Sequence, residues 1–215
     1  MTRQNRVSPY GEIVANPARG TLMGNRGGCI HDDSGDLERR RWASRAWIAC
    51  RLEFNDHRRQ VMAPGRYTEL FFLDEATALA AGQRPCFECR REDALNYVRA
   101  FARATGATSM KAPEVDAILH GGRRAVIGEE AAWQARPTDL PDGTIVDIAR
   151  SPHLWFGGRL YEWTFEGYRS APWGLSFEVE APVLTPRATV GALRAGYAAT
   201  VHASARIAED ARFNQ

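Results

Sequence analysis

Two cysteines at metal-ligand spacing are the most chemically specific feature of the sequence. Cys86 and Cys89 form a Cys-x-x-Cys pattern, which lets two thiolates converge on one tetrahedral ion. The chain has two further cysteines, and four thiolates complete a structural zinc site. We therefore predict Zn²⁺ bound by Cys86 and Cys89 together with Cys29 and Cys50, with His31 as the substitute ligand. A redox pair and two ordinary half-buried cysteines are the alternatives.

A second candidate site is the glycine-rich segment of residues 19–33. Its glycines allow a ligand to approach the backbone closely, and its arginines supply positive charge beside the exposed amides. A histidine next to aspartates can serve as a general base near neutral pH. The segment matches neither glycine-rich nucleotide-binding motif, so it predicts no nucleotide cofactor. The catalytic candidates are Asn25, His31 and Asp32, and the anion-binding candidates are Arg19 and Arg26. The alternative is a solvated surface turn.

The basic side chains are almost all arginines, and they are unevenly placed. Lys111 is the single lysine, and seven arginines lie between positions 39 and 59 against two acids. Arginine binds phosphates and base edges through two parallel hydrogen bonds. We therefore predict DNA or another nucleic acid as the partner; the alternative is a composition bias towards arginine. The predicted contacts are Arg39, Arg40, Arg41, Arg58 and Arg59.

Local signals around the cysteines predict the elements that position them. Residues 70–73 suit a buried strand, Asp74 suits a helix N-cap, and Gly82 ends that short helix. A second helix is predicted over 90–105, ended by Gly106, and a third over 113–119, ended by residues 120–124. Alternation over 42–54 predicts a strand with Cys50 facing inward, a hairpin tip at 55–58 and a return strand at 59–63.

The remaining segments complete an α+β fold. Residues 1–18 read as an irregular lead-in. Strands are predicted over 144–148 and 176–183, a hairpin over 154–165, and a helix capped by Thr185 with Pro186 in its first turn. We predict a zinc-knuckle unit of antiparallel strands and helices at 1–110, then a small β-rich unit closed by a helix at 111–215. A single continuous domain is the alternative.

Composition sets the broad class of the protein. The 215 residues are 44% hydrophobic with a net charge of +2, which supports a real core. The sequence has neither an apolar run long enough to span a bilayer nor a secretory leader, so we expect no membrane association and a cytoplasmic location. A reducing compartment favours metal over disulfide for the cysteines. No oligomeric state is predicted.

About 20 residues around the cysteine pair resemble a known family. The resemblance lies in Phe72, Ala76, Ala78, Ala81, Gly82 and the run Arg84-Pro85-Cys86-x-x-Cys89-Arg90. This pattern is similar to the metal-binding domain of the Ada-type adaptive-response DNA repair proteins. The resemblance implies four cysteines on zinc, one of which accepts a methyl group from a DNA phosphotriester. The family's upstream Cys-x-x-x-Cys pair is missing, and Cys29 and Cys50 would have to substitute for it.

Taken together, these features predict a zinc protein that acts on nucleic acid by repair or base modification. The alternatives are a small-molecule hydrolase or transferase that uses the glycine-rich loop, and a non-catalytic, protein-binding zinc module. The pattern Pro-Cys-x-x-Cys is also half of the zinc-deaminase signature, whose other half is His or Cys, one residue, then Glu. Cys50 to Glu53 is one residue too long for that half, and His31 to Asp33 ends in Asp.

Overall fold

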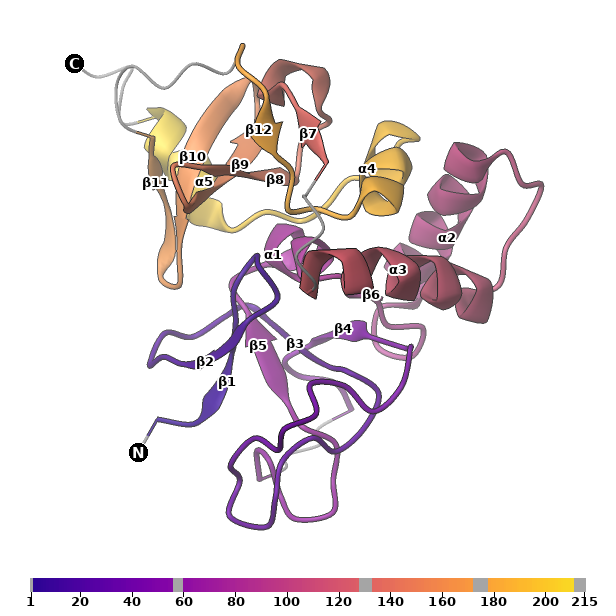
Figure 1. Ribbon diagram of the computed structural model, residues 1–215, viewed down its shortest axis with the longest axis vertical. Coiled ribbons are helices and arrows are strands. Elements are labelled where there is room, and N and C mark those ends of the chain that lie inside the picture. Colours follow the sequence, from indigo (N-terminus) through magenta and orange to yellow (C-terminus); the bar gives the residue numbers. More distant parts are fainter. Residues whose placement is uncertain (1, 56–59, 128–132, 172–177, 211–215) are drawn as a thin grey trace.

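The computed structural model describes residues 2–55, 60–127, 133–171 and 178–210. It combines helices, one mixed sheet and two antiparallel sheets, which confirms the predicted α+β class. Figure 1 shows the mixed sheet below the short helix α1 (Glu75–Ala80) and the antiparallel sheets above it. In the described part of the chain, no helix has the length and apolar character needed to cross a membrane.

The N-terminal sheet has six strands in the order β2-β1-β5-β3-β4-β6. The pairs β1–β2, β3–β5 and β3–β4 are antiparallel, as predicted for this unit, and the pairs β1–β5 and β4–β6 are parallel. The strands are β1 (Gln4–Val7), β2 (Ile13–Ala15), β3 (Leu22–Asn25), β4 (Ile48–Arg51), β5 (Leu70–Phe72) and β6 (Arg84–Pro85).

Three predictions for the N-terminal half are corrected. Residues 1–18 contain the hairpin β1–β2 instead of an irregular lead-in. The strand predicted over 42–54 shrinks to β4, because Trp47 and Ala49 also face a core and Leu52 is 49% exposed. Residues 60–63 form a turn instead of a return strand, and the neighbours of β4 are β3 and β6. The rest of the predicted hairpin lies at 56–59, outside the described residues.

The helix α1 lies at the centre of the packing. Asp74 caps it by accepting from the Thr77 N–H at 2.9 Å, and Gly82 follows it with φ +85°, as predicted. Every residue of α1 is buried. Its side chains enter three hydrophobic clusters: one with the C-terminal sheet, one with the helices, and one with the N-terminal sheet.

Four further α-helices follow α1 in the described part of the chain. The helix α2 (Arg91–Thr105) ends at Gly106 in the left-handed conformation, as predicted. The helix α3 (Ala112–Ile127) runs through Gly121 and Gly122, so its predicted end at 120–124 was wrong. The helix α4 (Arg187–Arg194) packs on α2, and α5 (Ala203–Asp210) packs on the last strand of the C-terminal sheet.

The C-terminal sheet is an antiparallel meander of β8 (Thr144–Ile148), β9 (Ser151–Phe156), β10 (Arg159–Thr164) and β11 (Gly167–Ser170). The predicted strand at 144–148 and hairpin at 154–165 are confirmed. Within 178–183 only β12 (Ala181–Pro182) is a strand, paired with β7 (Gln134–Ala135). Residues 176 and 177 lie outside the described ranges.

Two further details of the C-terminal part differ from prediction. The Thr185 hydroxyl accepts from the Ile145 N–H at 2.9 Å instead of capping α4, and Pro186 takes the cap position. Two helices, α4 and α5, follow the sheet where one was expected. The hydrophobic clusters join residues from both sides of position 110, and the proposed division there stays a prediction.

Substitution of Gly121 tests the course of α3, and substitution of Gly20 tests the close approach of that residue to β5. A Cβ at Gly121 would meet nothing within 4 Å, so Gly121→Ala should raise the free energy of unfolding by about 0.5–1 kcal/mol. A Cβ at Gly20 would lie 1.9 Å from the Phe72 carbonyl oxygen, so Gly20→Ala should lower it by about 1–3 kcal/mol. Urea denaturation measures both, and a destabilising Gly121→Ala would contradict a continuous α3.

Candidate metal centre

Three buried cysteines converge at the edge of the N-terminal sheet. The sulfurs of Cys50, Cys86 and Cys89 all lie within 4.8 Å of one another. Strand pairing brings them together, because β6 runs parallel to β4 and the Cys86 N–H donates to the Ala49 carbonyl at 3.0 Å. Cys50 stands next to Ala49 on β4, and Cys89 follows one turn after Cys86.

Backbone amides already point at two of these sulfurs. The Glu88 N–H donates to Cys86 Sγ and the Arg51 N–H donates to Cys89 Sγ, both at 3.4 Å. The pKa of the Cys86 thiol is lowered to about 5, chiefly because the Cys50 thiol donates a hydrogen bond to it. The same contact raises the pKa of Cys50, and burial raises that of Cys89. These shifts therefore favour a single thiolate, on Cys86, with the other two thiols protonated.

The donor set fits a thiolate-binding metal ion. In a tetrahedral zinc site with Zn–S of about 2.3 Å, neighbouring sulfurs stand about 3.8 Å apart, which lies within the 4.8 Å that bounds the sulfur separations here. Three cysteines can therefore hold a metal ion. Cys29 does not join them: its sulfur lies 3.6 Å from His31 Nδ1 and donates to the His31 carbonyl at 3.2 Å. Neither Cys29 nor His31 belongs to the cysteine group.

The cysteines open onto a cavity of about 530 Å³. The cavity lies on the sheet face opposite the core, because Leu70 and Phe72 are buried against α1 while Phe71 lines the cavity. Met23 pairs with Phe71 on one side and with Cys50 on the other, so these three form one row across the sheet. Three carboxylates share the lining, namely Glu53, Glu69 and Glu88.

Glu69 is the residue of this site that the sequence prediction missed. It is 4% exposed, and its Oε2 accepts from the Met62 N–H at 2.6 Å. Alternation along residues 69–72 contains the signal: if Leu70 and Phe72 face the core, Glu69 and Phe71 face the other side. A buried charged residue directly before the apolar strand β5 indicates that this other side is a candidate site.

The glycine-rich segment is arranged differently from the predicted proton relay. The His31 ring is buried, with Nδ1 2.6 Å from Thr68 Oγ1 and Nε2 3.3 Å from the Ala63 carbonyl. Asp32 is exposed, and its carboxylate accepts from the backbone of a turn at 34–36. Among the described contacts the two side chains do not meet. Asn25 lines the cysteine cavity and accepts from the Gly27 N–H at 2.9 Å.

The predicted basic residues fall into two environments. Arg26 is buried beside Trp47, with its guanidinium carbon 4.2 Å from the ring centroid. Four others are exposed, namely Arg19, Arg39, Arg40 and Arg41. Next to them Trp42 is 37% exposed. Arg58 and Arg59 lie outside the described residues. The nucleic-acid role of this set stays a prediction.

Comparison of the chain with protein-family models, curated proteins and solved structures found no match.

The metal content of cysteine variants tests whether Cys29 belongs to the metal site. We expect the chain purified in reducing buffer to carry about one metal ion per molecule. Cys50→Ser, Cys86→Ser and Cys89→Ser should each lower that content strongly, because each removes one of three thiolates. Cys29→Ser is the matched control and should retain the metal. Elemental analysis gives the answer; equal metal loss from Cys29→Ser would place Cys29 in the site.

Proposed function

We propose that this chain is a zinc-dependent enzyme that modifies nucleic acid, with the cysteine cavity as its active site. The observation that carries the proposal is the position of Cys50, Cys86 and Cys89 on the wall of a cavity of about 530 Å³. Three protein ligands leave a tetrahedral ion one ligand short, the pattern of catalytic rather than structural zinc. Zinc bound there would act as a Lewis acid on a group entering the cavity.

Glu69 is the proposed acid–base residue. Its Oε2 is held by the Met62 N–H, which orients the carboxylate and leaves Oε1 to exchange a proton with a ligand in the cavity. Glu53 and Glu88 are exposed at the rim, where water screens their charge. A cysteine zinc site with a glutamate that is not a ligand is the combination used in hydrolytic deamination of nucleobases, which makes base modification the favoured reaction.

The exposed basic loop supports a nucleic-acid substrate. Arg39, Arg40 and Arg41 are exposed beside the partly exposed Trp42, and Arg51 lines the cavity itself. Arginines that bind phosphates next to an aromatic ring that stacks on a base are a common arrangement in single-strand binding. A reducing, cytoplasmic setting keeps the thiols available for metal.

The resemblance to Ada-type repair domains supports a second candidate, methyl transfer to a cysteine. In that reaction a cysteine sulfur bonds to the methyl carbon, the carbon–oxygen bond of the phosphotriester breaks, and a phosphodiester leaves. If Cys50 is taken as the first cysteine of the family's Cys-x-x-x-Cys pair, the second cysteine position falls on Phe54. The Phe54 side chain packs against the three cysteines. The chain would then bind zinc with three thiolates and keep one of them as the acceptor.

Substitution at Glu69 tests the proposed reaction. Glu69→Gln should keep metal content and fold while lowering turnover about 10²–10⁴-fold, the usual contribution of general acid–base catalysis. Glu88→Gln, at the rim of the same cavity, is the control and should retain activity. Mass spectrometry of single-stranded oligonucleotides incubated with the protein detects base modification. A methyl group gained by a cysteine peptide from methylated DNA would instead establish the second candidate.

Charge reversal in the exposed loop tests the substrate class. The double variant Arg40→Glu, Arg41→Glu should weaken binding across sequences and flatten the dependence of log K on log salt by about 0.7 per lost contact on single strands. Arg99→Glu, an exposed position on α2, is the control and should bind normally. Fluorescence anisotropy at several salt concentrations measures both. If the double variant binds as tightly as the unaltered chain, the nucleic-acid surface lies elsewhere on the protein or does not exist.

A further inference from the structure

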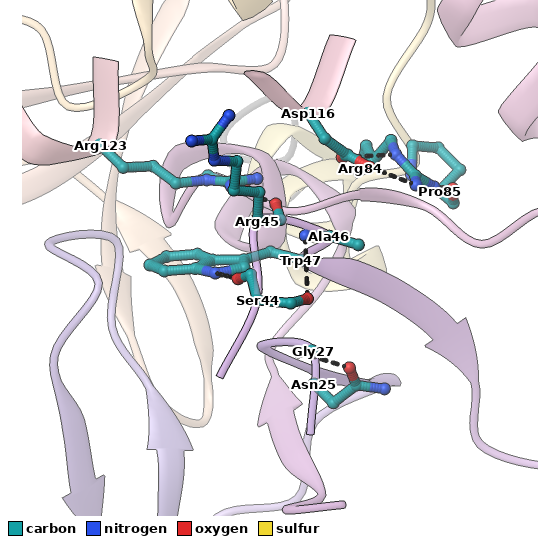
Figure 2. A network of polar contacts seen from close by, with 11 residues as sticks. Asn25, Gly27, Ser44, Arg45, Ala46, Trp47, Arg84, Pro85, Asp116 and Arg123 are labelled. Carbon is teal, nitrogen blue, oxygen red and sulfur yellow. Dashed lines mark hydrogen bonds and ion pairs between the residues drawn. The ribbon is translucent and has the colours of Figure 1, made fainter. Parts of the chain in front are cut away.

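Two arginine side chains are buried together over one tryptophan ring. The guanidinium carbons of Arg26 and Arg123 lie 4.2 Å and 4.3 Å from the Trp47 ring centroid. Both residues are nearly inaccessible, at 2% and 3% exposure. Figure 2 shows Arg123 extended along the Trp47 ring, with Arg45 beside it. The two arginines come from the loop after β3 and from α3, so only the folded chain brings their charges together.

The hydrogen bonds of these two groups are all with neutral acceptors. Arg26 Nη2 donates to the Gly11 carbonyl at 2.7 Å, and Arg26 Nε is buried without a partner among the described residues. Arg123 donates from Nε to the Gly82 carbonyl and from Nη1 to the Arg45 carbonyl, both at 2.8 Å. Within the described ranges neither guanidinium forms an ion pair with a carboxylate.

Two other buried arginines each form an ion pair with a carboxylate, which compensates the charge that is buried. Arg84 lies 2.8 Å from Asp116, and Arg90 lies 2.7 Å from Glu75. Burying a charge without such a partner is costly. Burial and the neighbouring arginine lower the pKa of Arg26 to about 9, and burial lowers that of Arg123 to about 10. A negative charge next to both would remove this cost.

A small cavity lies beside the two groups. It measures about 20 Å³ and is lined by both arginines, Trp47, Gly11 and Gly82, among others. That volume holds one water-sized species, and it is too small for the four oxygens of a phosphate. We propose that this cavity is a binding site for a single small monovalent anion of halide size, chloride being the abundant one, held by the guanidinium groups of Arg26 and Arg123.

The melting temperature of the intact chain tests the site. At constant ionic strength, replacing sodium gluconate with sodium chloride should raise the melting temperature by several degrees and then saturate, because the anion binds only the folded state. Arg26→Met keeps an unbranched apolar stem, removes the guanidinium group and should abolish this dependence. Arg99→Met, which removes an exposed arginine, should retain it. Equal melting temperatures in both salts, or a chloride effect that survives Arg26→Met, would overturn the proposal.

A direct measurement on the unaltered protein covers the case in which Arg26→Met does not fold. Crystals grown in sodium bromide should show anomalous scattering from one bromide in the cavity, within hydrogen-bonding distance of both guanidinium groups. Water alone at that position, or bromide only on the outer surface, would overturn the proposal. The result is independent of the cysteine site, because neither arginine lines that cavity.

Discussion

The complete burial of α1 is the constraint on which the rest of the structure depends. A six-residue helix with no exposed face must satisfy every polar group at its start from within the protein. Asp74 accepts from the Thr77 side chain at 2.7 Å and from the His202 N–H at 2.9 Å. Glu75 accepts from the Tyr197 hydroxyl at 2.5 Å and from Arg90 at 2.7 Å. These acids therefore tie the N-terminal sheet to the C-terminal segment.

The same arrangement positions the cysteines. The chain leaves α1 at Gly82, pairs as β6 with β4, and so delivers Cys86 beside Cys50. At the far end of the knuckle, Arg90 is held by Glu75, which anchors the residue next to Cys89. The cysteine group is thus held by strand pairing on one side and by a buried ion pair on the other. Such support from outside the ligand set is what keeps thiolates in place before an ion binds.

Arginine side chains occupy three distinct environments in the described part of this chain. Arg84 and Arg90 neutralise buried acids inside the core, where a planar, weakly hydrated guanidinium is easier to bury than an ammonium. Arg26 and Arg123 stack on an indole ring and donate to carbonyls. The third group, at 39–41, is exposed. The arginines of the described residues are therefore not gathered on a single basic surface.

The sequence by itself determined the features that depend only on residues close together in the chain. The Asp74 cap, the left-handed Gly82 and the hairpin at 154–165 were predicted because local hydrogen bonding and backbone sterics decide them. Which cysteines converge was decided only by tertiary structure, because the pairing of β6 with β4 brings Cys50 to the Cys-x-x-Cys pair and leaves Cys29 with His31. Likewise, the site at Glu69 follows from burial of a sheet face, and burial is set by contacts between segments far apart in the sequence.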